Sequence, residues 1–275
     1  MRSTLATTMR RYPILSFFSD IATYGKTQWP TKFNWADPKM PVINDPVLGA
    51  GRKVIDMTIP ESYGGGGTST DNPRGQLQGP SSLYPGAQVW SSFSLLLPSG
   101  FPLPTLAAPS GWNSFYQIHG RSTTGYPSFR IAFEGDDGSF GWKRQPTKGG
   151  EWACAITPQY DAWMDFAIAV NMSPDPAVGW IEVWSNFGAG WVQRPLVASA
   201  GDTLVGNRLY TETITAGFEA GSNYAAHVQN YRKEDMFDSC TCYHGDQRQV
   251  PITNYSTEAA ALVAGTFTAL DPNSY

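Results

Sequence analysis

Short runs in which apolar and polar residues alternate recur along the chain from about residue 52 onward. Clusters of Gly, Pro, Asp and Ser separate these runs, as at residues 64–67, 98–100, 135–138 and 173–176, and such clusters mark turns. Helical periodicity is concentrated in the Ala-rich stretch 257–264. This spacing predicts an all-β sandwich. The expected strands are 53–59, 74–78, 87–97, 112–119, 128–134, 163–172, 179–187, 208–218, 224–233 and 238–244.

The composition supports one large β-domain. The chain has 275 residues, a length that a single sandwich often uses, and its 28 Gly and 21 Pro supply many turns. Aromatic residues make up 13% and charged residues only 15%, a balance that favours strands. Residues 1–40 lack clean periodicity yet carry several aromatic rings. We therefore expect an N-terminal extension or docking arm over 1–40, available to other proteins or to a second copy, and a single domain over 41–275.

The charge and hydropathy of the chain exclude two classes of partner. A formal net charge of -4 gives no long-range attraction to nucleic acid or to an anionic membrane surface. No apolar run reaches the roughly 18 to 20 residues that a membrane span needs, and no secretory signal peptide is recognisable at the N-terminus. We expect neither nucleic acid nor a membrane as a partner.

The three cysteines, Cys154, Cys240 and Cys242, do not suit a disulfide framework. A bridge between Cys240 and Cys242 would close a strained, very small ring. With His244, these two cysteines offer at most three close ligands to zinc. We therefore expect no metal and no other cofactor.

Polar side chains share faces on two of the expected strands, because successive residues of a strand point to opposite sides. The strand 112–119 and the run 224–233 are both rich in amide, imidazole and phenol groups. Asn230 and Arg232 fall on the reverse side of the second strand. The residues expected to share a face are Asn113, Phe115, Gln117 and His119 in the first strand, and His227, Gln229, Tyr231 and Lys233 in the second.

A polar stripe also follows the strand 74–78, where Arg74, Gln76 and Gln78 project together. The strands 128–134, with Arg130 outside, and 179–187 likewise combine one apolar face with one polar and aromatic face. Such faces, curved by sheet twist, can stack sugars on their aromatic rings. The alternative is an ordinary solvated strand face, which every sandwich has.

Paired carboxylates of the kind that glycoside hydrolases use are not evident. Sandwich hydrolases place two acids on one strand face, typically in the pattern Glu-x-Asp-x-x-Glu. The segments that begin at Glu134 and Glu234 both miss this pattern. A retaining hydrolase is therefore disfavoured.

Several short motifs follow one another in a recognisable order. They are Arg74-Gly75-Gln76-Leu77, Tyr84-Pro85-Gly86-Ala87-Gln88-Val89-Trp90, Leu97-Pro98-Ser99-Gly100-Phe101-Pro102, Phe115-Tyr116-Gln117-Ile118-His119-Gly120, Gly179-Trp180-Ile181-Glu182-Val183-Trp184 and Asn230-Tyr231-Arg232-Lys233. In order and spacing they resemble the jelly-roll polysaccharide lyases of the heparinase I and glucuronan lyase group. The resemblance covers roughly residues 50–250 and implies a concanavalin-A-like jelly-roll sandwich of two antiparallel sheets.

The resemblance also implies a chemistry. Family members cleave uronic-acid glycans by β-elimination, which needs neutralisation of the sugar carboxylate, a base for the C5 proton and an acid for the leaving oxygen. The catalytic residues implied are His119, Tyr231 and Lys233, with Tyr231 or His119 moving the proton. A phenol needs cationic neighbours for this role. The substrate-binding residues implied are Arg74, Gln76, Gln117, Arg130 and Gln229.

One departure from the family pattern separates two hypotheses. Many relatives have Glu where this chain has Gln76, so a carboxylate that could orient the arginine is missing. The first hypothesis is an active lyase that acts on an acidic or cell-wall polysaccharide. The second is a non-catalytic, lectin-like or structural minor tail protein. Similar domains occur in phage tails, so the expected location is a virion tail or the extracellular space, reached without a classical signal peptide.

Overall fold

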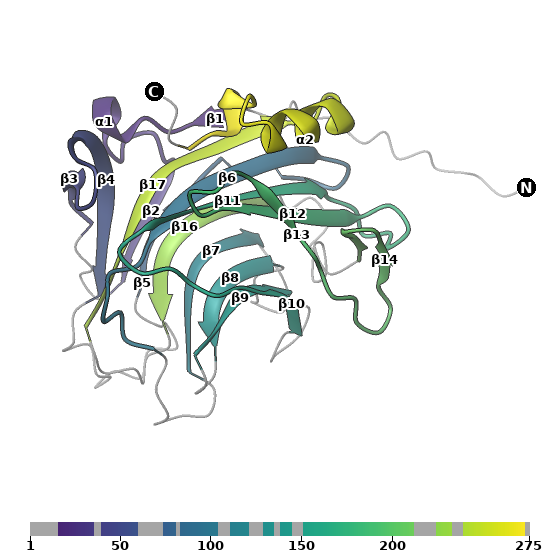
Figure 1. The fold of residues 1–275 in the computed structure, drawn as a ribbon, viewed down its shortest axis with the longest axis horizontal. Coiled ribbons are helices and arrows are strands. Elements are labelled where there is room, and N and C mark those ends of the chain that lie inside the picture. The colour runs from purple at the N-terminus through teal and green to yellow at the C-terminus, as the bar shows by residue number, and fades with distance from the viewer. Residues whose placement is uncertain are drawn as a thin grey trace, which may run out of the picture.

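The computed structural model of the chain describes residues 16–35, 40–59, 74–80, 83–103, 111–120, 129–134, 138–144, 151–211, 224–232 and 239–272. These residues form two antiparallel sheets that stack as layers (Figure 1). No helix among them is long and apolar enough to cross a membrane. The architecture is the expected jelly-roll sandwich.

The described residues give a larger sheet of ten strands and a smaller one of seven. The larger sheet has the order β14 (Thr203–Val205), β15 (Arg208–Tyr210), β12 (Trp180–Asn186), β11 (Trp163–Asn171), β6 (Gln88–Leu96), β17 (Cys240–Pro251), β4 (Gly49–Ile59) and β3 (Val42–Asp45), with β1 (Phe17–Phe18) paired to β17 and β13 (Val192–Arg194) paired to β12. The smaller sheet has the order β10 (Glu151–Ala155), β9 (Ser139–Arg144), β8 (Phe129–Glu134), β7 (Trp112–Gly120), β16 (Tyr224–Arg232), β5 (Arg74–Gln78) and β2 (Thr31–Trp35).

The core lies between the two sheets and is rich in aromatic rings. Phe93 of β6 stacks on Tyr116 of β7, with ring centroids 4.3 Å apart, and so joins the two layers. Trp142 of β9 stacks on Phe129 of β8 at 4.9 Å. Buried aromatic pairs of this kind stabilise a fold beyond the area they bury, by about 0.5–1.5 kcal/mol each. The apolar positions of the alternating runs thus form the inner faces.

A bulge in β7 changes which residues face the core. The register between β7 and β8 shifts between Ser114 and Tyr116. Phe115 and Tyr116 are consequently both in the core, and Asn113 Nδ2 approaches Cys240 Sγ of the other sheet at 3.6 Å. The expectation that Asn113 and Phe115 share the face of Gln117 was wrong, because the extra residue of a bulge breaks strict alternation.

The N-terminal segment contributes to both sheets. β1 pairs with β17 and β2 pairs with β5. Trp29 is almost fully buried and its Nε1 donates to Gln247 Oε1 at 3.0 Å. Residues 16–35, which we expected to form an arm, therefore pack with the sandwich, while residues 1–15 lie outside the described part of the chain. Docking to another protein stays a prediction.

The C-terminal segment covers part of the outer face of the larger sheet (Figure 1). It consists of the helix α2 (Tyr255–Val263), which lies close to the expected helix, and the 3-10 turn η1 (Thr268–Leu270). Another short helix, α1 (Ile21–Tyr24), belongs to the N-terminal segment instead. Trp90 Nε1 donates to Glu258 at 2.9 Å, and Trp184 packs in the same cluster. The aromatic face of β12 is thus covered by protein, so it is not a sugar-stacking surface.

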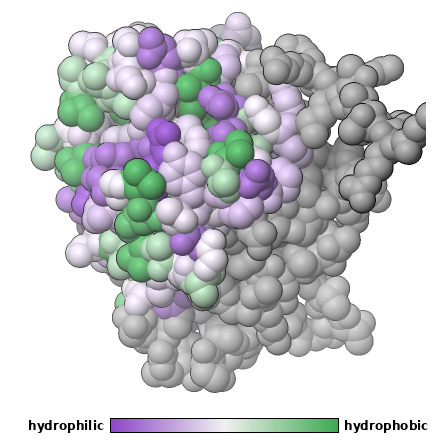
Figure 2. Space-filling model, turned by 90° about the vertical axis from the view of Figure 1, so that its right-hand side faces the viewer, coloured by the Kyte–Doolittle hydropathy of each residue, from purple (hydrophilic) through white to green (hydrophobic). Residues whose placement is uncertain are grey.

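The end of the molecule that carries β14 exposes both apolar and hydrophilic side chains. Figure 2 shows apolar and hydrophilic groups interspersed on the described part of that side. Several aliphatic side chains are exposed there in separate places, among them Val192 and Val205. Isolated apolar side chains of this kind are normal on a soluble surface and indicate no binding site.

Candidate functional site

The candidate site lies on the outer face of the smaller sheet. Leu77 of β5, Ile118 of β7 and Val228 of β16 belong to the core. The residues that alternate with them therefore point away from the larger sheet. Cross-strand pairing aligns one row of these outward residues over five neighbouring strands. The row consists of Gln78, His227, Gln117, Arg130 and Lys143.

Tyr231 of β16 lies four residues beyond His227 on the same face and has a cation beside its ring. It pairs in register with Arg74 of β5 and with Ser114 of β7. The Arg74 guanidinium carbon lies 5.2 Å from the centroid of the Tyr231 ring. Trp112 of β7 meets the same ring edge to face, with centroids 4.8 Å apart. All three side chains are half-buried, so the phenol is supported on two sides and still reaches the surface.

His227 is a buried, neutral imidazole at the centre of this face. Nε2 of Gln76 contacts Nδ1 of His227. Because an amide N–H can only donate, His227 Nδ1 accepts and the imidazole proton lies on Nε2 of His227. The pKa of His227 is lowered to about 3, chiefly by burial, and the positive charges of His119 and Arg74 contribute to this shift. Within the described residues, neither His227 Nε2 nor Gln76 Oε1 has a hydrogen-bond partner. Buried polar atoms usually have one, so this pair offers a donor and an acceptor to a ligand.

Gln229 and His119 extend the polar face on either side of His227. Gln229 Nε2 donates to Ser114 Oγ at 2.8 Å, while its Oε1 has no partner among the described residues. The His119 ring lies 6.2 Å from the His227 ring, measured between centroids. His119 is half-buried and Gln229 is fully buried. Amide and imidazole groups therefore form the floor of the site.

Two cations and one carboxylate lie on the neighbouring strands β8 and β9. Glu134 contacts both the Arg130 guanidinium and the Lys143 ammonium group. Burial lowers the pKa of Arg130 to about 10, an effect that Tyr231 partly offsets. Burial and the charge of Arg130 lower the pKa of Lys143 to about 8. This side of the site remains positively charged at neutral pH.

The structure brings together most of the residues implied by the sequence. Arg74, Gln76, Gln117, His119, Arg130, Gln229 and Tyr231 all lie on this one face. Lys233 lies outside the described residues. Arg232, on the reverse side as expected, is fully buried and its Nη1 points to Cys240 Sγ at 4.0 Å.

Three residues of the site were not assigned a role from the sequence: His227, Lys143 and Trp112. Alternation had already placed His227 beside Tyr231, so that signal was present in the sequence. Lys143 gave no such signal, because the strand Ser139–Arg144 was not expected. Trp112 joins the face because of the β7 bulge, which no pattern in the sequence revealed.

The buried histidines should make the fold sensitive to acid. The pKa of His227 is lowered to about 3 and that of His244 to about 4, chiefly by burial. Below pH ~6.5 the unfolded chain binds protons that the folded chain does not bind. The free energy of unfolding should therefore fall as the pH decreases from about 6.5 towards 4, by about 1.4 kcal/mol per pH unit for each histidine.

Urea unfolding at a series of pH values measures this slope. His227→Gln removes one of the two titrating groups, so its free energy of unfolding should fall less steeply with decreasing pH than that of the parent. Carboxylates contribute equally to both proteins and cancel in the comparison. Equal slopes would show that His227 is not held neutral in the fold.

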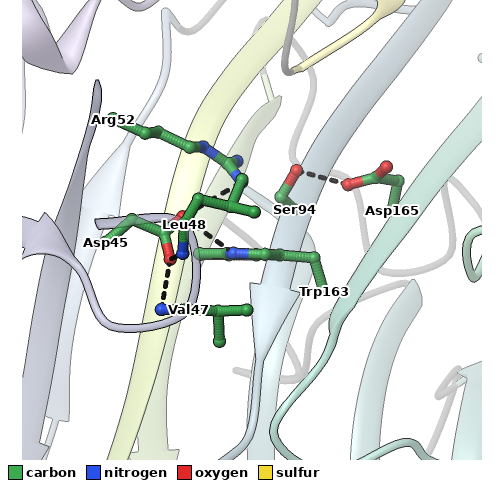
Figure 3. Close-up of polar contacts among 7 residues, drawn as sticks. All are labelled: Asp45, Val47, Leu48, Arg52, Ser94, Trp163 and Asp165. Carbon is green, nitrogen blue, oxygen red and sulfur yellow. Dashed lines mark hydrogen bonds and ion pairs between the residues drawn. The ribbon is translucent and has the colours of Figure 1, made fainter. Parts of the chain in front are cut away.

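A second polar cluster, on the larger sheet, has a structural role (Figure 3). Asp45 accepts hydrogen bonds from the backbone N–H groups of Val47 and Leu48 and from Trp163 Nε1, and it pairs with Arg52 at 3.4 Å. The Arg52 guanidinium also stacks on Trp163 at 4.1 Å. The Asp45 carboxylate is thereby saturated, and it ties the turn between β3 and β4 to β11.

A cavity of about 360 Å³ lies between the end of α2 and the larger sheet, and Trp191 is part of its lining. Its polar lining includes Asp165, whose carboxylate accepts from Ser94 Oγ at 2.6 Å, and Asp271 (Figure 3 shows the first pair). Two carboxylates repel an acidic glycan. Charge thus disfavours this cavity as a site for the acidic glycan that the sequence resemblance implies.

The three cysteines are buried and unpaired, and Cys240 and Cys242 lie inside the sandwich. Burial raises the pKa of each thiol, that of Cys154 to about 11. Thiols in this state are poor nucleophiles. They pack as small apolar residues.

Comparisons with known proteins bear on the fold and on the family of the chain. No curated protein sequence matches the chain. The chain is similar in structure to an alginate lyase from Aplysia kurodai, with 9% identity, 88% of this chain and 100% of that chain covered, and a TM-score of 0.54. It is also similar to an alginate lyase from Klebsiella pneumoniae (12% identity, 77% and 84% covered, TM-score 0.49) and to a carbohydrate esterase from the Shiga toxin-encoding bacteriophage phi24B (12%, 88% and 98%, TM-score 0.49).

At these identities the likeness to solved structures shows the fold alone, the jelly-roll sandwich. The sequence itself carries the stronger finding. Residues 20–200, well over half of the chain, match the family profile described as polysaccharide lyase. The chain belongs to the polysaccharide lyase family.

Proposed function

We propose that this domain cleaves an acidic, uronate-containing polysaccharide by β-elimination on the outer face of the smaller sheet. One observation carries the proposal: cross-strand register places Gln117, His227 and the Arg74–Tyr231 pair on one face. These groups supply what the elimination needs, namely hydrogen-bond donors for a carboxylate and a group that transfers a proton.

Each of the three chemical tasks has a candidate residue. The Gln117 amide and the neutral His227 Nε2–H group would hold the sugar carboxylate and stabilise the negative charge that develops as C5 loses its proton. Tyr231, ionised to the phenolate, would accept that proton and become a neutral phenol. The Arg74 guanidinium beside its ring would favour the phenolate before the transfer. His119, half-buried at the edge, would donate a proton to the leaving oxygen.

Gln76 replaces a carboxylate of many relatives, and its contact with His227 indicates how the site works without one. A glutamate here would place a negative charge next to Nδ1 and favour a protonated imidazole. The glutamine amide instead donates to Nδ1 and keeps the ring neutral. Fixing the tautomer in this way leaves Nε2–H as a donor for the substrate.

The direct test is to incubate the protein with a panel of polyuronates, glycans with alternating uronate and neutral sugars, and neutral glucans. β-Elimination leaves a double bond conjugated to the carboxylate, so ultraviolet absorbance should rise with acidic glycans only. New reducing ends without this absorbance would indicate hydrolysis and would overturn the proposal.

The same assay addresses the rival hypothesis, a non-catalytic glycan-binding or structural component of a virion tail. That hypothesis predicts binding of an envelope glycan, or no binding, with no product. The observation that favours catalysis is the pairing of a supported phenol with a cation, since a binding surface requires neither. Mass spectrometry of purified phage tails would show whether the chain occurs as a virion component.

A further inference from the structure

Two buried amide oxygens on the candidate face have no hydrogen-bond partner among the residues that the structure describes: Oε1 of Gln76 and Oε1 of Gln229. Gln76 is 2% exposed and Gln229 is fully buried. The two residues pair directly across β5 and β16, and both point away from the core between the sheets. Directly opposed residues have Cβ atoms about 4.5–5.5 Å apart. The two amides therefore belong to one patch of the floor of the site.

The contacts of Gln229 fix which end of its amide is available to a ligand. Nε2 of Gln229 donates to Ser114 Oγ at 2.8 Å, and the Ser114 hydroxyl in turn donates to the backbone carbonyl of Ile131 at 3.5 Å. Because this hydroxyl has one hydrogen and directs it to Ile131, its oxygen accepts from the amide. The nitrogen end of Gln229 is thus held by β7, and the carbonyl end is left for a ligand.

Gln76 is held in the same way, by its neighbour His227. Its Nε2 donates to Nδ1 of the imidazole, so its Oε1 is the available end. A buried polar atom without a partner is unfavourable, and such atoms are rare in native proteins. Here two of them are cross-strand neighbours on the face that would bind the substrate. A carbonyl oxygen can only accept, so the ligand groups that complete this patch must be two hydrogen-bond donors.

The chemistry of the elimination limits which groups of the reacting sugar can donate. That uronate loses its C5 proton and the oxygen at C4, its carboxylate is ionised, and its C1 carries the link to the next sugar. Only the hydroxyl groups at C2 and C3 remain as hydrogen-bond donors. They are attached to adjacent carbons and so present two donors side by side, which matches two neighbouring acceptors.

The position of Gln229 along β16 suits this assignment. Gln229 lies two residues from His227, which would hold the carboxylate, and two residues from Tyr231, which would accept the C5 proton. All three side chains point to the same face, because successive residues of a strand alternate. A sugar held by its carboxylate at His227, with C5 towards Tyr231, therefore lies over Gln229 and its neighbour Gln76.

We propose that Gln76 and Gln229 accept hydrogen bonds from the C2 and C3 hydroxyl groups of the reacting uronate, and so select a sugar in which both hydroxyls are unsubstituted. The inference rests on the proposed function and deepens it by naming the substrate class. A sulfate or acyl group at C2 or C3 removes a donor and brings further acceptor oxygens against the amide oxygens. The preferred substrates are therefore polyuronates without sulfate or ester groups on these hydroxyls.

Binding to the full-length Tyr231→Phe protein tests this recognition, because turnover is suppressed while the ring stays in place. Isothermal titration would use four uronate tetrasaccharides: one with free hydroxyls, one without the C2 hydroxyl, one without the C3 hydroxyl and one sulfated at C2. Loss of either hydroxyl, which adds no bulk, should weaken binding about 10- to 100-fold because a buried acceptor stays unmet. The sulfate should also weaken binding, although its negative charge is attracted to the cations of this face.

Gln229→Leu, added to the same background, removes the amide oxygen and keeps a similar volume. It should weaken binding of the unmodified tetrasaccharide about 10-fold or more. It should leave unchanged the binding of the deoxy compound that lacks the partner hydroxyl, because removal of either member of a pair removes the same hydrogen bond. Gln193→Leu, a matched change on the larger sheet where the Gln193 amide donates to Glu182, should have no effect.

Two results would overturn the hydroxyl recognition: equal binding of the unmodified tetrasaccharide and either deoxy compound, or tighter binding of the sulfated one, which would show that the face attracts anions in general. Neither comparison needs a variant at Gln229, so misfolding of that variant cannot obscure them. If the parent forms no unsaturated product from any glycan, the proposed elimination fails, while the binding measurements still decide the recognition. If product forms but binding shows no preference, the recognition alone fails.

Discussion

Replacement of Tyr231 by phenylalanine should reduce the rate of glycan cleavage by about 10²- to 10⁴-fold, the usual contribution of a positioned acid or base. The substitution deletes only the hydroxyl group. The ring keeps its edge-to-face contact with Trp112 and its contact with Arg74. We therefore expect kcat to fall, with KM and the affinity for substrate nearly unchanged, because the hydroxyl acts in the transition state.

Initial rates of double-bond formation, together with titration of an oligosaccharide, measure both effects. Tyr160→Phe is the matched control, since Tyr160 is exposed and lies outside the site. Its kcat should equal that of the parent. A Tyr231→Phe protein with full activity would assign the proton transfer to another residue, and His119 would then be the first candidate.

Replacement of Gln117 by alanine should lower kcat by about 10²- to 10³-fold, the range measured when a donor to a developing negative charge is removed. Gln117 is buried on the outer face, opposite His227 and Arg130. Its amide is positioned by β7 before substrate binds. Truncation opens no space in the core between the sheets, so stability should change little.

The kinetic constants and the melting temperature together separate chemistry from folding. Gln193→Ala is the control, because the Gln193 amide donates to Glu182 on the larger sheet at 2.6 Å and takes no part in the site. Gln193→Ala should keep the parental kcat. If Gln117→Ala raised KM and left kcat unchanged, Gln117 would contribute to ground-state binding alone.

The sequence predicted the fold class because period-two alternation and turn clusters are local signals. The runs around Leu77, Ile118 and Val228 alternate cleanly, and all three residues are in the core. The chain order of these runs, by contrast, says little about which strands become neighbours. β16 lies between β5 and β7, pairings that long connections in the sequence do not reveal.

Most residues of the candidate site were predicted from the sequence, but their arrangement across the strands was not. Alternation placed Gln117 with His119, and His227 with Tyr231, since each pair lies within one strand. That Gln117 lies opposite His227 depends on register between strands about 110 residues apart, which packing and turn geometry set. The β7 bulge also escaped prediction, although it determines that Trp112 supports Tyr231.

The positions of the last two long strands have a consequence for how the chain folds during its synthesis. β16 and β17 are late in the sequence, yet each lies between earlier strands in the middle of its sheet. The hydrogen bond from Ser19 to Asp246 spans 227 residues. Until β17 leaves the ribosome, both sheets are split and present unpaired edges, and contacts of such high sequence separation form slowly. Nascent chains should depend on chaperones through this interval, and a chain that terminates early has neither a closed sandwich nor Tyr231.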